Sequence, residues 1–370
     1  MREYLVVFGV AVAVTYMAAT AVRLIALRFG VMAKVRDRDV HDKPTPYLGG
    51  VAMLAGLIAA YLVALQLPFL SRSDEIFSDV LGVMAGGAII AIVGVLDDIY
   101  ELDALSKFAG QVFAAIIAIA MGVQYFYVPW PGNYVGLDQT QAIIFTIFMI
   151  VLTANAVNFV DGLDGLSSGI VGIGAVAFFI FAFVLAMQNG ENRAVGAALL
   201  TAALAGVCVG MLPHNFFPAR MFIGDSGSML IGFVLAGSAI SLSGRFPVTG
   251  DEVTGSGAGI LPALLPLILP FTILIVPFID LTLAVIRRTR AGVSPFSADK
   301  LHIHHRLLEI GHSHRRAVLL MYAMAALVAF GSVILVLWSG PISLVAFVLL
   351  AFLTLTVMFW APRYGLKDHS

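Results

Sequence analysis

The stretch NFVDGLDGLSSGI, residues 158–170, places two carboxylates three residues apart within a very apolar part of the chain. Twenty-two uncharged residues, 139–160, precede Asp161, and twenty-six, 165–190, follow Asp164. About 20 helical residues are needed to cross the hydrocarbon core of a membrane. The stretch is therefore typical of a polar turn that joins two membrane spans.

The whole chain shares this apolar character. Of its 370 residues, 60% are hydrophobic and 12% are charged, whereas a soluble domain carries about 25% charged residues. The formal net charge is −1, so the composition argues against a nucleic-acid partner. The first apolar run, 4–22, lacks a small-residue cleavage pattern and is expected to be retained as a span.

The sequence predicts an all-α, polytopic integral membrane protein that forms a single transmembrane helical domain with about eleven spans. The predicted spans lie near 4–28, 47–67, 79–96, 107–123, 140–159, 168–187, 194–212, 226–243, 261–286, 317–338 and 342–361. The loops expected to carry the active site are 30–46, 97–107, 160–167, 213–226 and 287–316.

The distribution of Lys and Arg predicts the orientation of these spans. The loops after the odd-numbered spans, together with the C-terminus, carry fifteen Lys and Arg residues, whereas the opposite face carries four. Since cytoplasmic loops are enriched in Lys and Arg, the first face is expected to be cytoplasmic. The N-terminus is then outside and the C-terminus inside. The clusters of polar residues reach the same cytoplasmic face, which indicates a reaction that uses cytoplasmic material.

Asp97 and Asp98 end an uncharged run that begins at residue 80. Two adjacent carboxylates at a membrane boundary repel each other, and burial penalises their charged forms. A bound cation or nearby basic side chains would relieve this repulsion. The alternative is a helix end that emerges into water, where acidic residues are common.

The segment FIGDSGS, residues 222–228, places Asp225 between two glycines, directly before another apolar run. Glycine allows a backbone to approach an anion closely. A carboxylate in this setting suits Mg²⁺, which prefers a few carboxylate oxygens together with phosphate oxygens and water. Ser226 and Ser228 would add donors. The alternative is a helix N-cap at the start of the next span.

Asn158, Asp161 and Asp164 follow one another at intervals of three residues. On a helical turn such residues share one face. Because an asparagine side chain both accepts and donates hydrogen bonds, this face suits a metal ion together with a sugar or base edge. The alternative is a pair of capping acids.

Basic side chains near the same face suit phosphate binding. Histidine and arginine together bind a pyrophosphate well, and lysine neutralises a phosphate charge. The residues concerned are His302, His304, His305, Arg306, Lys43 and Lys107. A zinc site in the histidine segment is less favoured because no cysteine lies nearby. An exposed basic loop, and ordinary cytoplasmic anchors in the case of the two lysines, remain as alternatives.

Acids for a divalent cation and bases for phosphates thus meet on one face of a lipid-embedded bundle. This combination predicts phosphoryl transfer between a soluble, nucleotide-like donor and a membrane-embedded acceptor. A lipid or solute transporter is the alternative from another class. Transporters, however, tend to place their charges near the bilayer midplane, between structural repeats.

Four motifs resemble those of the polyprenyl-phosphate N-acetylhexosamine-1-phosphate transferase family. They are LDD at 96–98, NAVNFVDGLDGL at 155–166, FIGDSGS at 222–228 and HIHHRL at 302–307, and KPTPYLGG at 43–50 resembles a further segment. The resemblance covers nearly the whole chain, in order. It implies transfer of an aminosugar-1-phosphate from a UDP-sugar to a polyprenyl phosphate, with release of UMP and a requirement for Mg²⁺, for which Mn²⁺ is an alternative.

The resemblance also implies roles for individual residues. Asp97 and Asp98 would lie near the lipid phosphate, one of them as a base, and Asp225 would be the principal Mg²⁺ ligand. Asn158 would assist with the metal. The substrate site would contain Asn158, Asp161, Asp164, Asn215, His302, His304, His305 and Arg306. Lys43 and Lys107 are added to this site as candidates because of their charge.

The histidine segment distinguishes between branches of the family. The branch that uses UDP-MurNAc-pentapeptide carries three consecutive histidines, whereas here Ile303 interrupts the run. The chain therefore resembles the bacterial UDP-GlcNAc branch, whose members begin cell-envelope glycans at the inner (plasma) membrane with the active site facing the cytoplasm. Phospho-MurNAc-pentapeptide transfer is the alternative. The expected partners are UDP-GlcNAc, polyprenyl phosphate and membrane lipid, with a homodimer as one option for assembly.

Overall fold

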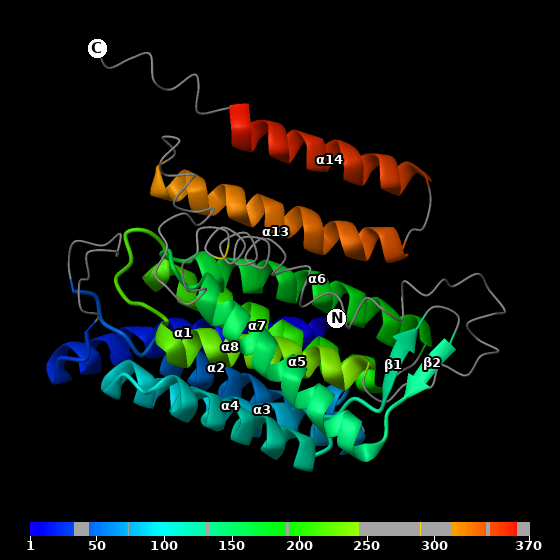
Figure 1. The fold of residues 1–370 in the computed structure, drawn as a ribbon, viewed down its shortest axis with the longest axis horizontal. Coiled ribbons are helices and arrows are strands. Elements are labelled where there is room, and N and C mark those ends of the chain that lie inside the picture. Colours follow the sequence, from blue (N-terminus) through cyan, green and yellow to red (C-terminus); the bar gives the residue numbers. More distant parts are fainter. Residues whose placement is uncertain are drawn as a thin grey trace.

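The computed structural model describes residues 1–32, 44–72, 74–130, 133–189, 192–243, 313–337 and 341–360, together with Thr289. The helices are α1 (Arg2–Phe29), α2 (Gly49–Ala64), η1 (Leu70–Arg72), α3 (Asp74–Tyr100), α4 (Ala104–Ala120), α5 (Gln139–Val160), α6 (Leu166–Asn189), α7 (Asn192–Asn215), α8 (Gly224–Ser243), α13 (His314–Leu337) and α14 (Pro341–Trp360). Figure 1 shows them as a bundle of roughly aligned rods.

The lengths and compositions of these helices confirm a multi-pass, mainly α-helical membrane protein. In the described part of the chain, seven helices are long and apolar enough to cross a membrane, and shorter apolar helices lie at 49–64 and 104–120. Ten of the predicted spans overlap a described helix. The span predicted at 261–286 lies outside the described residues.

Two features differ from the sequence prediction. First, β1 (Tyr127–Trp130) and β2 (Asn133–Gly136) pair as an antiparallel hairpin between α4 and α5, where the sequence predicted only a connection between two spans. Second, α3 extends to Tyr100, four residues beyond the predicted end of the span. Asp97 and Asp98 therefore lie in the last turn of a helix. They remain helical because their side chains find partners there, as described below.

The centre of the bundle is α8. Every residue from Ser226 to Leu242 is buried, and α8 packs against α2, α3, α5 and α7. Figure 1 shows α8 in the middle of the bundle, with α2, α3 and α4 on one side and α6 and α13 on the other. Its glycine, serine and alanine residues allow close helix packing, which is the usual means of association in membranes. The Asp225 end of α8 is thus surrounded by other helices.

Glycines bring three backbones together at this end of α8. A Cβ atom on Gly50 would lie 2.3 Å from the backbone nitrogen of Gly227, and one on Gly94 would lie 2.3 Å from Cα of Ser226. The backbone N–H groups of Gly49 and Gly50 donate to the carbonyl oxygens of Phe222 and Ile223, at 3.1 and 3.0 Å. The start of α2 and the end of α3 therefore hold the segment that precedes α8 in place.

Candidate active site

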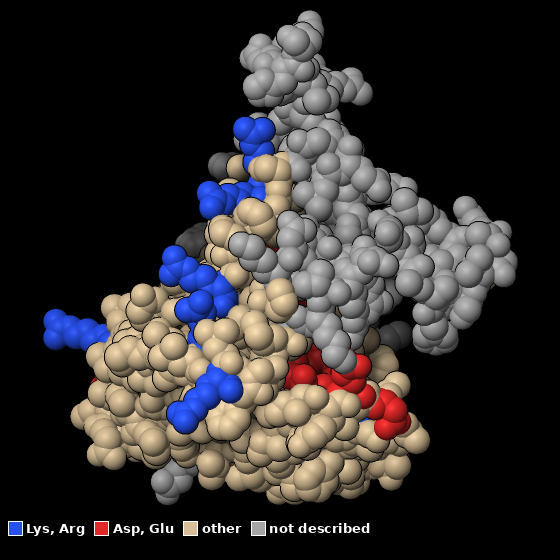
Figure 2. Space-filling model, turned by 90° about the vertical axis from the view of Figure 1, so that its left-hand side faces the viewer, with Lys and Arg blue, Asp and Glu red and all other residues tan. Residues whose placement is uncertain are grey.

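Acidic side chains gather on one end of the bundle. Figure 2 shows this end, which is the left-hand side of Figure 1, with one cluster of Asp and Glu and with separate Lys and Arg side chains on the neighbouring surface. The described loops that meet here are those around residues 97–107, 160–167 and 213–226. The structure thus brings together three of the loops expected to carry the active site.

Asp98 is bound to the first turn of α8. Its Oδ1 accepts the backbone N–H of Asp225 at 2.8 Å, and its Oδ2 accepts the hydroxyl of Ser226 at 2.8 Å and its backbone N–H at 3.3 Å. A carboxylate at a helix N-terminus satisfies free N–H groups and interacts favourably with the helix dipole. Asp98 therefore caps α8 from a different helix.

Gly224 makes this cap sterically feasible. Its φ is 68°, in the left-handed region that favours glycine, and a Cβ atom at this position would lie 2.5 Å from Oδ2 of Asp98. The glycine before Asp225 therefore serves the approach of a carboxylate of the protein itself.

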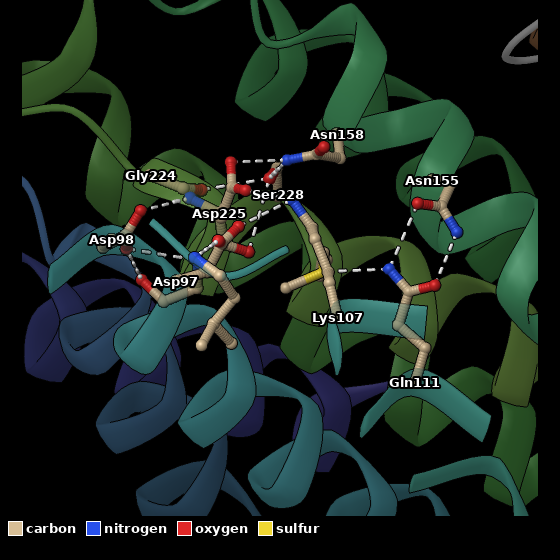
Figure 3. A network of polar contacts seen from close by, with 12 residues as sticks. Asp97, Asp98, Lys107, Gln111, Asn155, Asn158, Gly224, Asp225 and Ser228 are labelled. Carbon is tan, nitrogen blue, oxygen red and sulfur yellow. Dashed lines mark hydrogen bonds and ion pairs between the residues drawn. The ribbon is translucent and has the colours of Figure 1, made fainter. Parts of the chain in front are cut away.

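Asp97 faces the lysine of the next helix. Its Oδ1 accepts the backbone N–H of Leu102 at 2.8 Å, which fixes the turn between α3 and α4. Its Oδ2 forms an ion pair with Nζ of Lys107 at 2.8 Å. Lys107 also forms a short ion pair with Oδ2 of Asp225. One ammonium group thus bridges the carboxylates of Asp97 and Asp225 (Figure 3).

Asp103 sets the start of the helix that carries Lys107. Its carboxylate accepts the backbone N–H groups of Leu105 and Ser106 at 3.1 and 3.2 Å, and the Ser106 hydroxyl at 2.6 Å. These hydrogen bonds from Ser106 and Leu105 lower the pKa of Asp103. A capped first turn keeps Lys107 in register with the acids.

Asn158 completes this cluster from α5. Its Nδ2 donates to Oδ1 of Asp225 and to Oγ of Ser228, both at 2.8 Å. Ser228 is buried and donates in turn to the carbonyl oxygen of Gly224 at 3.0 Å. In this arrangement the amide nitrogen of Asn158, not its oxygen, faces Asp225. If Asn158 is a metal ligand, as predicted, the ligating atom would therefore be Oδ1.

A second polar group lies at the turn between α5 and α6. Oδ1 of Asp161 accepts the hydroxyl of Ser167 at 2.6 Å, and Oδ2 of Asp164 accepts the backbone N–H of Ala219 at 2.9 Å. Tyr322 of α13 donates to the carbonyl oxygen of Gly165 in the same turn. The turn is thereby attached both to the segment before α8 and to α13.

The charges of the two groups influence each other. Burial raises the pKa of the Asp161 carboxyl to about 7, although the Ser167 hydrogen bond acts in the opposite direction. The nearby charges of Asp225, Asp98 and Asp164 also raise this pKa. Asp161 therefore lies within the electrostatic field of the acid cluster, where a cation would favour its ionised form.

Asn215 occupies a more internal position than its predicted substrate role suggests. Its side chain is 2% exposed. Its Nδ2 donates to the carbonyl oxygen of Met221 at 3.1 Å, and its Oδ1 accepts the hydroxyl of Ser168 at 3.3 Å. In this structure Asn215 holds the segment before α8 in shape. Direct contact with a substrate stays a prediction.

Several predicted site residues lie outside the part of the chain that the structure describes. They are Lys43, His302, His304, His305 and Arg306. Gln111 and Asn155 also lie beside the cluster in Figure 3, although neither was predicted from the sequence as a site residue. The available signal was two amides within otherwise apolar runs, one helical turn from Lys107 and Asn158 respectively.

The carboxylates fit a small divalent cation of the Mg²⁺ type. Among the described residues there is no group of three or more His, Cys, Asp or Glu side chains that would enclose a metal. However, Oδ2 of Asp97 and Oδ2 of Asp225 converge on one cation, the Lys107 ammonium. Mg²⁺ is characteristically held by one or two carboxylates, with substrate phosphates and water completing its coordination. The donor set suits a metal that arrives with a phosphorylated substrate.

Comparison with known proteins identifies the family of the chain. Residues 80–243 match the family described as Glycosyl transferase family 4. The chain is 43% identical, over 90% of its length and 82% of the relative's, to decaprenyl-phosphate N-acetylglucosaminephosphotransferase of Mycolicibacterium smegmatis. It is 26% identical, over 83% of its length and 77% of the relative's, to undecaprenyl-phosphate alpha-N-acetylglucosaminyl 1-phosphate transferase of Escherichia coli. A phospho-N-acetylmuramoyl-pentapeptide-transferase of Desulforudis audaxviator is 33% identical over 89% of this chain and 97% of its own.

Fold, site and comparisons together define a polytopic membrane transferase. The chain belongs to the polyprenyl-phosphate N-acetylhexosamine-1-phosphate transferase family, as its motifs indicated.

Proposed function

We propose that the protein transfers GlcNAc-1-phosphate from UDP-GlcNAc to a polyprenyl phosphate, and so begins a cell-envelope glycan. One structural observation carries the proposal. Asp97, Lys107, Asn158 and Asp225, from four different helices, form one connected cluster at the end of a lipid-embedded bundle. The names of the relatives from M. smegmatis and E. coli support a polyprenyl-phosphate acceptor and a GlcNAc-phosphate donor.

The proposed reaction is a direct phosphoryl transfer. An oxygen of the polyprenyl phosphate attacks the phosphorus that carries the sugar. The bond between this phosphorus and the oxygen bridging to UMP breaks, and UMP leaves with the electron pair. A phosphate monoester has a second pKa of about 6, so the attacking oxygen is largely ionised at neutral pH. Positioning and charge neutralisation are therefore the main tasks of the protein.

Lys107 and Asp97 are assigned these tasks at the acceptor side. The Lys107 ammonium exchanges its contact with Asp225 for a phosphate oxygen and reduces the repulsion between the two anionic substrates. Asp97, which is held by the Leu102 N–H, orients the acceptor phosphate or takes its remaining proton. A two-step route through an aspartyl-phosphate is the alternative. Isolation of a phosphorylated enzyme after incubation with donor alone would favour that second route.

Asp225 is assigned to Mg²⁺, with Mn²⁺ as an alternative ion. Asp225 would hold the ion, which when bound would supply positive charge near the donor pyrophosphate and the leaving UMP. Asn158 would support this arrangement through its contact with Asp225. Asp161 and Asp164 would line the nucleotide side. Lys43, His302, His304, His305 and Arg306 are proposed to contact donor phosphates, on the basis of their motifs alone.

The proposed location is the bacterial inner membrane, with the site at the cytoplasmic surface. The relatives named above are bacterial, and the described helices are apolar enough to cross a membrane several times. The excess of Lys and Arg in the sequence after the odd-numbered predicted spans supports this orientation, with the N-terminus outside and the C-terminus inside. An acceptor in the inner leaflet would reach the site without its tail leaving the hydrocarbon. A count of eleven spans and a homodimer stay predictions.

A donor panel tests the proposal. The purified protein would be incubated with polyprenyl phosphate, Mg²⁺ and either UDP-GlcNAc, UDP-GalNAc or UDP-MurNAc-pentapeptide, and released UMP would be measured. We expect UMP release that depends on acceptor and is fastest with UDP-GlcNAc, and the Asp225→Asn variant is the negative control. Preference for UDP-MurNAc-pentapeptide would instead identify the other branch. A complete absence of UMP, together with transbilayer movement of a lipid or solute in vesicles, would identify the protein as a transporter and not as an enzyme.

A further inference from the structure

Beside the acid cluster, a second polar group joins the same helices. Gln111 of α4 and Asn155 of α5 exchange amide hydrogen bonds: Nε2 of Gln111 donates to Oδ1 of Asn155 at 3.1 Å, and Nδ2 of Asn155 donates to Oε1 of Gln111 at 2.7 Å. Nε2 of Gln111 also contacts Sδ of Met229, on α8, at 3.1 Å. Figure 3 shows this amide pair next to Lys107. The group therefore connects α4, α5 and α8.

The positions of these residues repeat the arrangement of the acid cluster. Residues three or four apart on a helix lie on the same face, one turn from each other. The three pairs are Lys107 with Gln111 on α4, Asn158 with Asn155 on α5, and Asp225 with Met229 on α8. Each helix thus presents one residue to the acid cluster and, one turn further into the bundle, a second residue to the amide group.

The hydrogen-bonding groups of the amide pair fix its orientation. Nδ2 of Asn155 uses its second hydrogen to donate to the carbonyl oxygen of Val151 at 2.8 Å, so both amide groups use all of their N–H donors. Rotating either amide by 180° would place oxygen against oxygen, or oxygen against sulfur. Gln111 is 1% exposed and has no access to water as a substitute partner, whereas Asn155 is exposed. The orientation of the buried Gln111 amide therefore fixes that of the Asn155 amide that pairs with it.

We propose that Gln111, Asn155 and Met229 form a positioning layer that sets the separation of Lys107, Asn158 and Asp225 for phosphoryl transfer. This inference rests on the proposed function for its effect on turnover. A displacement of α4 by a single residue along its axis moves Lys107 by about 1.5 Å relative to Asp225. The layer opposes this displacement because the amide pair tolerates no such shift without losing its hydrogen bonds.

Substitutions that remove the amide pair test the positioning role. We expect Gln111→Leu and Asn155→Leu each to lower kcat at least about tenfold, because misplacement by about 1 Å can cost about a hundredfold. KM for the nucleotide sugar should change by less than about twofold, since a positioning role leaves substrate binding unchanged. Ser238→Ala is the matched control: its buried hydroxyl donates only to the Val234 carbonyl of its own helix. It should leave kcat unchanged.

The transposed double variant separates positioning from a general loss of stability. Gln111→Asn combined with Asn155→Gln keeps two amides and the same total side-chain length across the helix pair. We expect its kcat to be at least about threefold higher than the kcat of either leucine variant. The reason is that the effects of substitutions at paired groups are non-additive. Single variants with normal kcat, or a transposed variant no better than Gln111→Leu, would overturn the inference.

A second measurement does not depend on the enzymatic reaction. Acylation of Lys107 by an amine reagent would be followed by mass spectrometry, with folded protein in detergent. We expect Lys107 to react several-fold faster in Gln111→Leu and Asn155→Leu than in the wild type or Ser238→Ala, because a misplaced ammonium leaves its carboxylate partners. An unchanged labelling rate would show that the layer does not position Lys107. Absence of turnover in the wild type would reject the proposed function and leave this measurement valid.

Discussion

Asp98, in the last turn of α3, accepts the backbone N–H of Asp225 at 2.8 Å, although the two residues are 127 positions apart in the sequence. The same carboxylate accepts both donor groups of Ser226. The residue that heads α8 is therefore positioned by an acid from another helix. Asp97 and Asp98 thus have different environments: Asp98 faces the backbone of α8, whereas Asp97 faces Lys107.

Removal of this cap should affect both stability and turnover. We expect Asp98→Ala to lower the free energy of unfolding by about 1 kcal/mol, a value typical for loss of a helix N-cap. The same change should lower kcat at least about a hundredfold, because Asp225 is no longer held. Thermal unfolding in detergent and UMP release would be measured in parallel. Ser226→Ala, which removes only one of the three hydrogen bonds, should have a smaller effect on both.

Normal stability combined with a complete loss of activity in Asp98→Asn would contradict a positioning role for Asp98. If Asp98→Asn, which retains an acceptor oxygen, unfolded at the wild-type temperature but had no activity at all, then the charge of Asp98 would act in the chemical step itself. Recovery of most activity in Asp98→Asn would instead support the cap.

Gly224→Ala should destabilise the protein through the same contact. The φ of 68° and the 2.5 Å approach of Asp98 Oδ2 leave no room for a Cβ atom. We expect a loss of more than about 1 kcal/mol in the free energy of unfolding, since alanine is strained at positive φ. Gly9→Ala in α1 is the control, because no atom lies within 4 Å of its Cβ position. Equal melting temperatures for the two variants would refute the steric argument.

Much of the fold follows from the sequence because apolar runs of about 20 residues have few alternatives in a chain this hydrophobic. The hairpin at 127–136 was missed because its strands are four residues each and lack a clear alternating pattern. The end of α3 was placed too early because the expectation assumed that acids leave the helix. The side-chain partners of Asp97 and Asp98 come from residues that are distant in sequence, and no local pattern reveals them.

The proximity of several candidate residues was more predictable than the contacts that each of them makes. Asp97, Lys107, Asn158 and Asp225 do converge, as their shared face of the membrane implied. The environment of Asn215 was not foreseen, because its burial depends on how α6 and the segment before α8 pack. Gln111 and Asn155 carry no charge, and their only sequence signal is a spacing of one helical turn from Lys107 and Asn158, which does not by itself distinguish a paired amide from an isolated one.

Asp161 should make stability depend on pH. Its pKa is raised to about 7, above the ordinary value of 3.8, so the folded protein retains a proton that the unfolded chain releases in the intervening range. This contribution to stability is complete below about pH 3.8 and is lost as the pH rises through 7. Asp161→Asn resembles the protonated acid. The melting temperature of this variant minus that of the wild type should therefore increase as the pH rises from 5 to 8. A constant difference over this range would show that Asp161 is already ionised at pH 5.

Asp225→Asn should abolish turnover at any Mg²⁺ concentration, because a neutral amide neither matches the charge of the carboxylate nor pairs with Lys107. Binding of Mn²⁺ in the presence of the nucleotide sugar, followed by electron paramagnetic resonance, would report on the metal without requiring catalysis. We expect its affinity to fall at least about tenfold in Asp225→Asn, consistent with loss of a ligand to a divalent ion. Asp103→Asn, at the exposed start of α4, should bind Mn²⁺ as the wild type does. Wild-type Mn²⁺ affinity in an inactive Asp225→Asn variant would assign the metal to other side chains and leave Asp225 as the partner of Lys107.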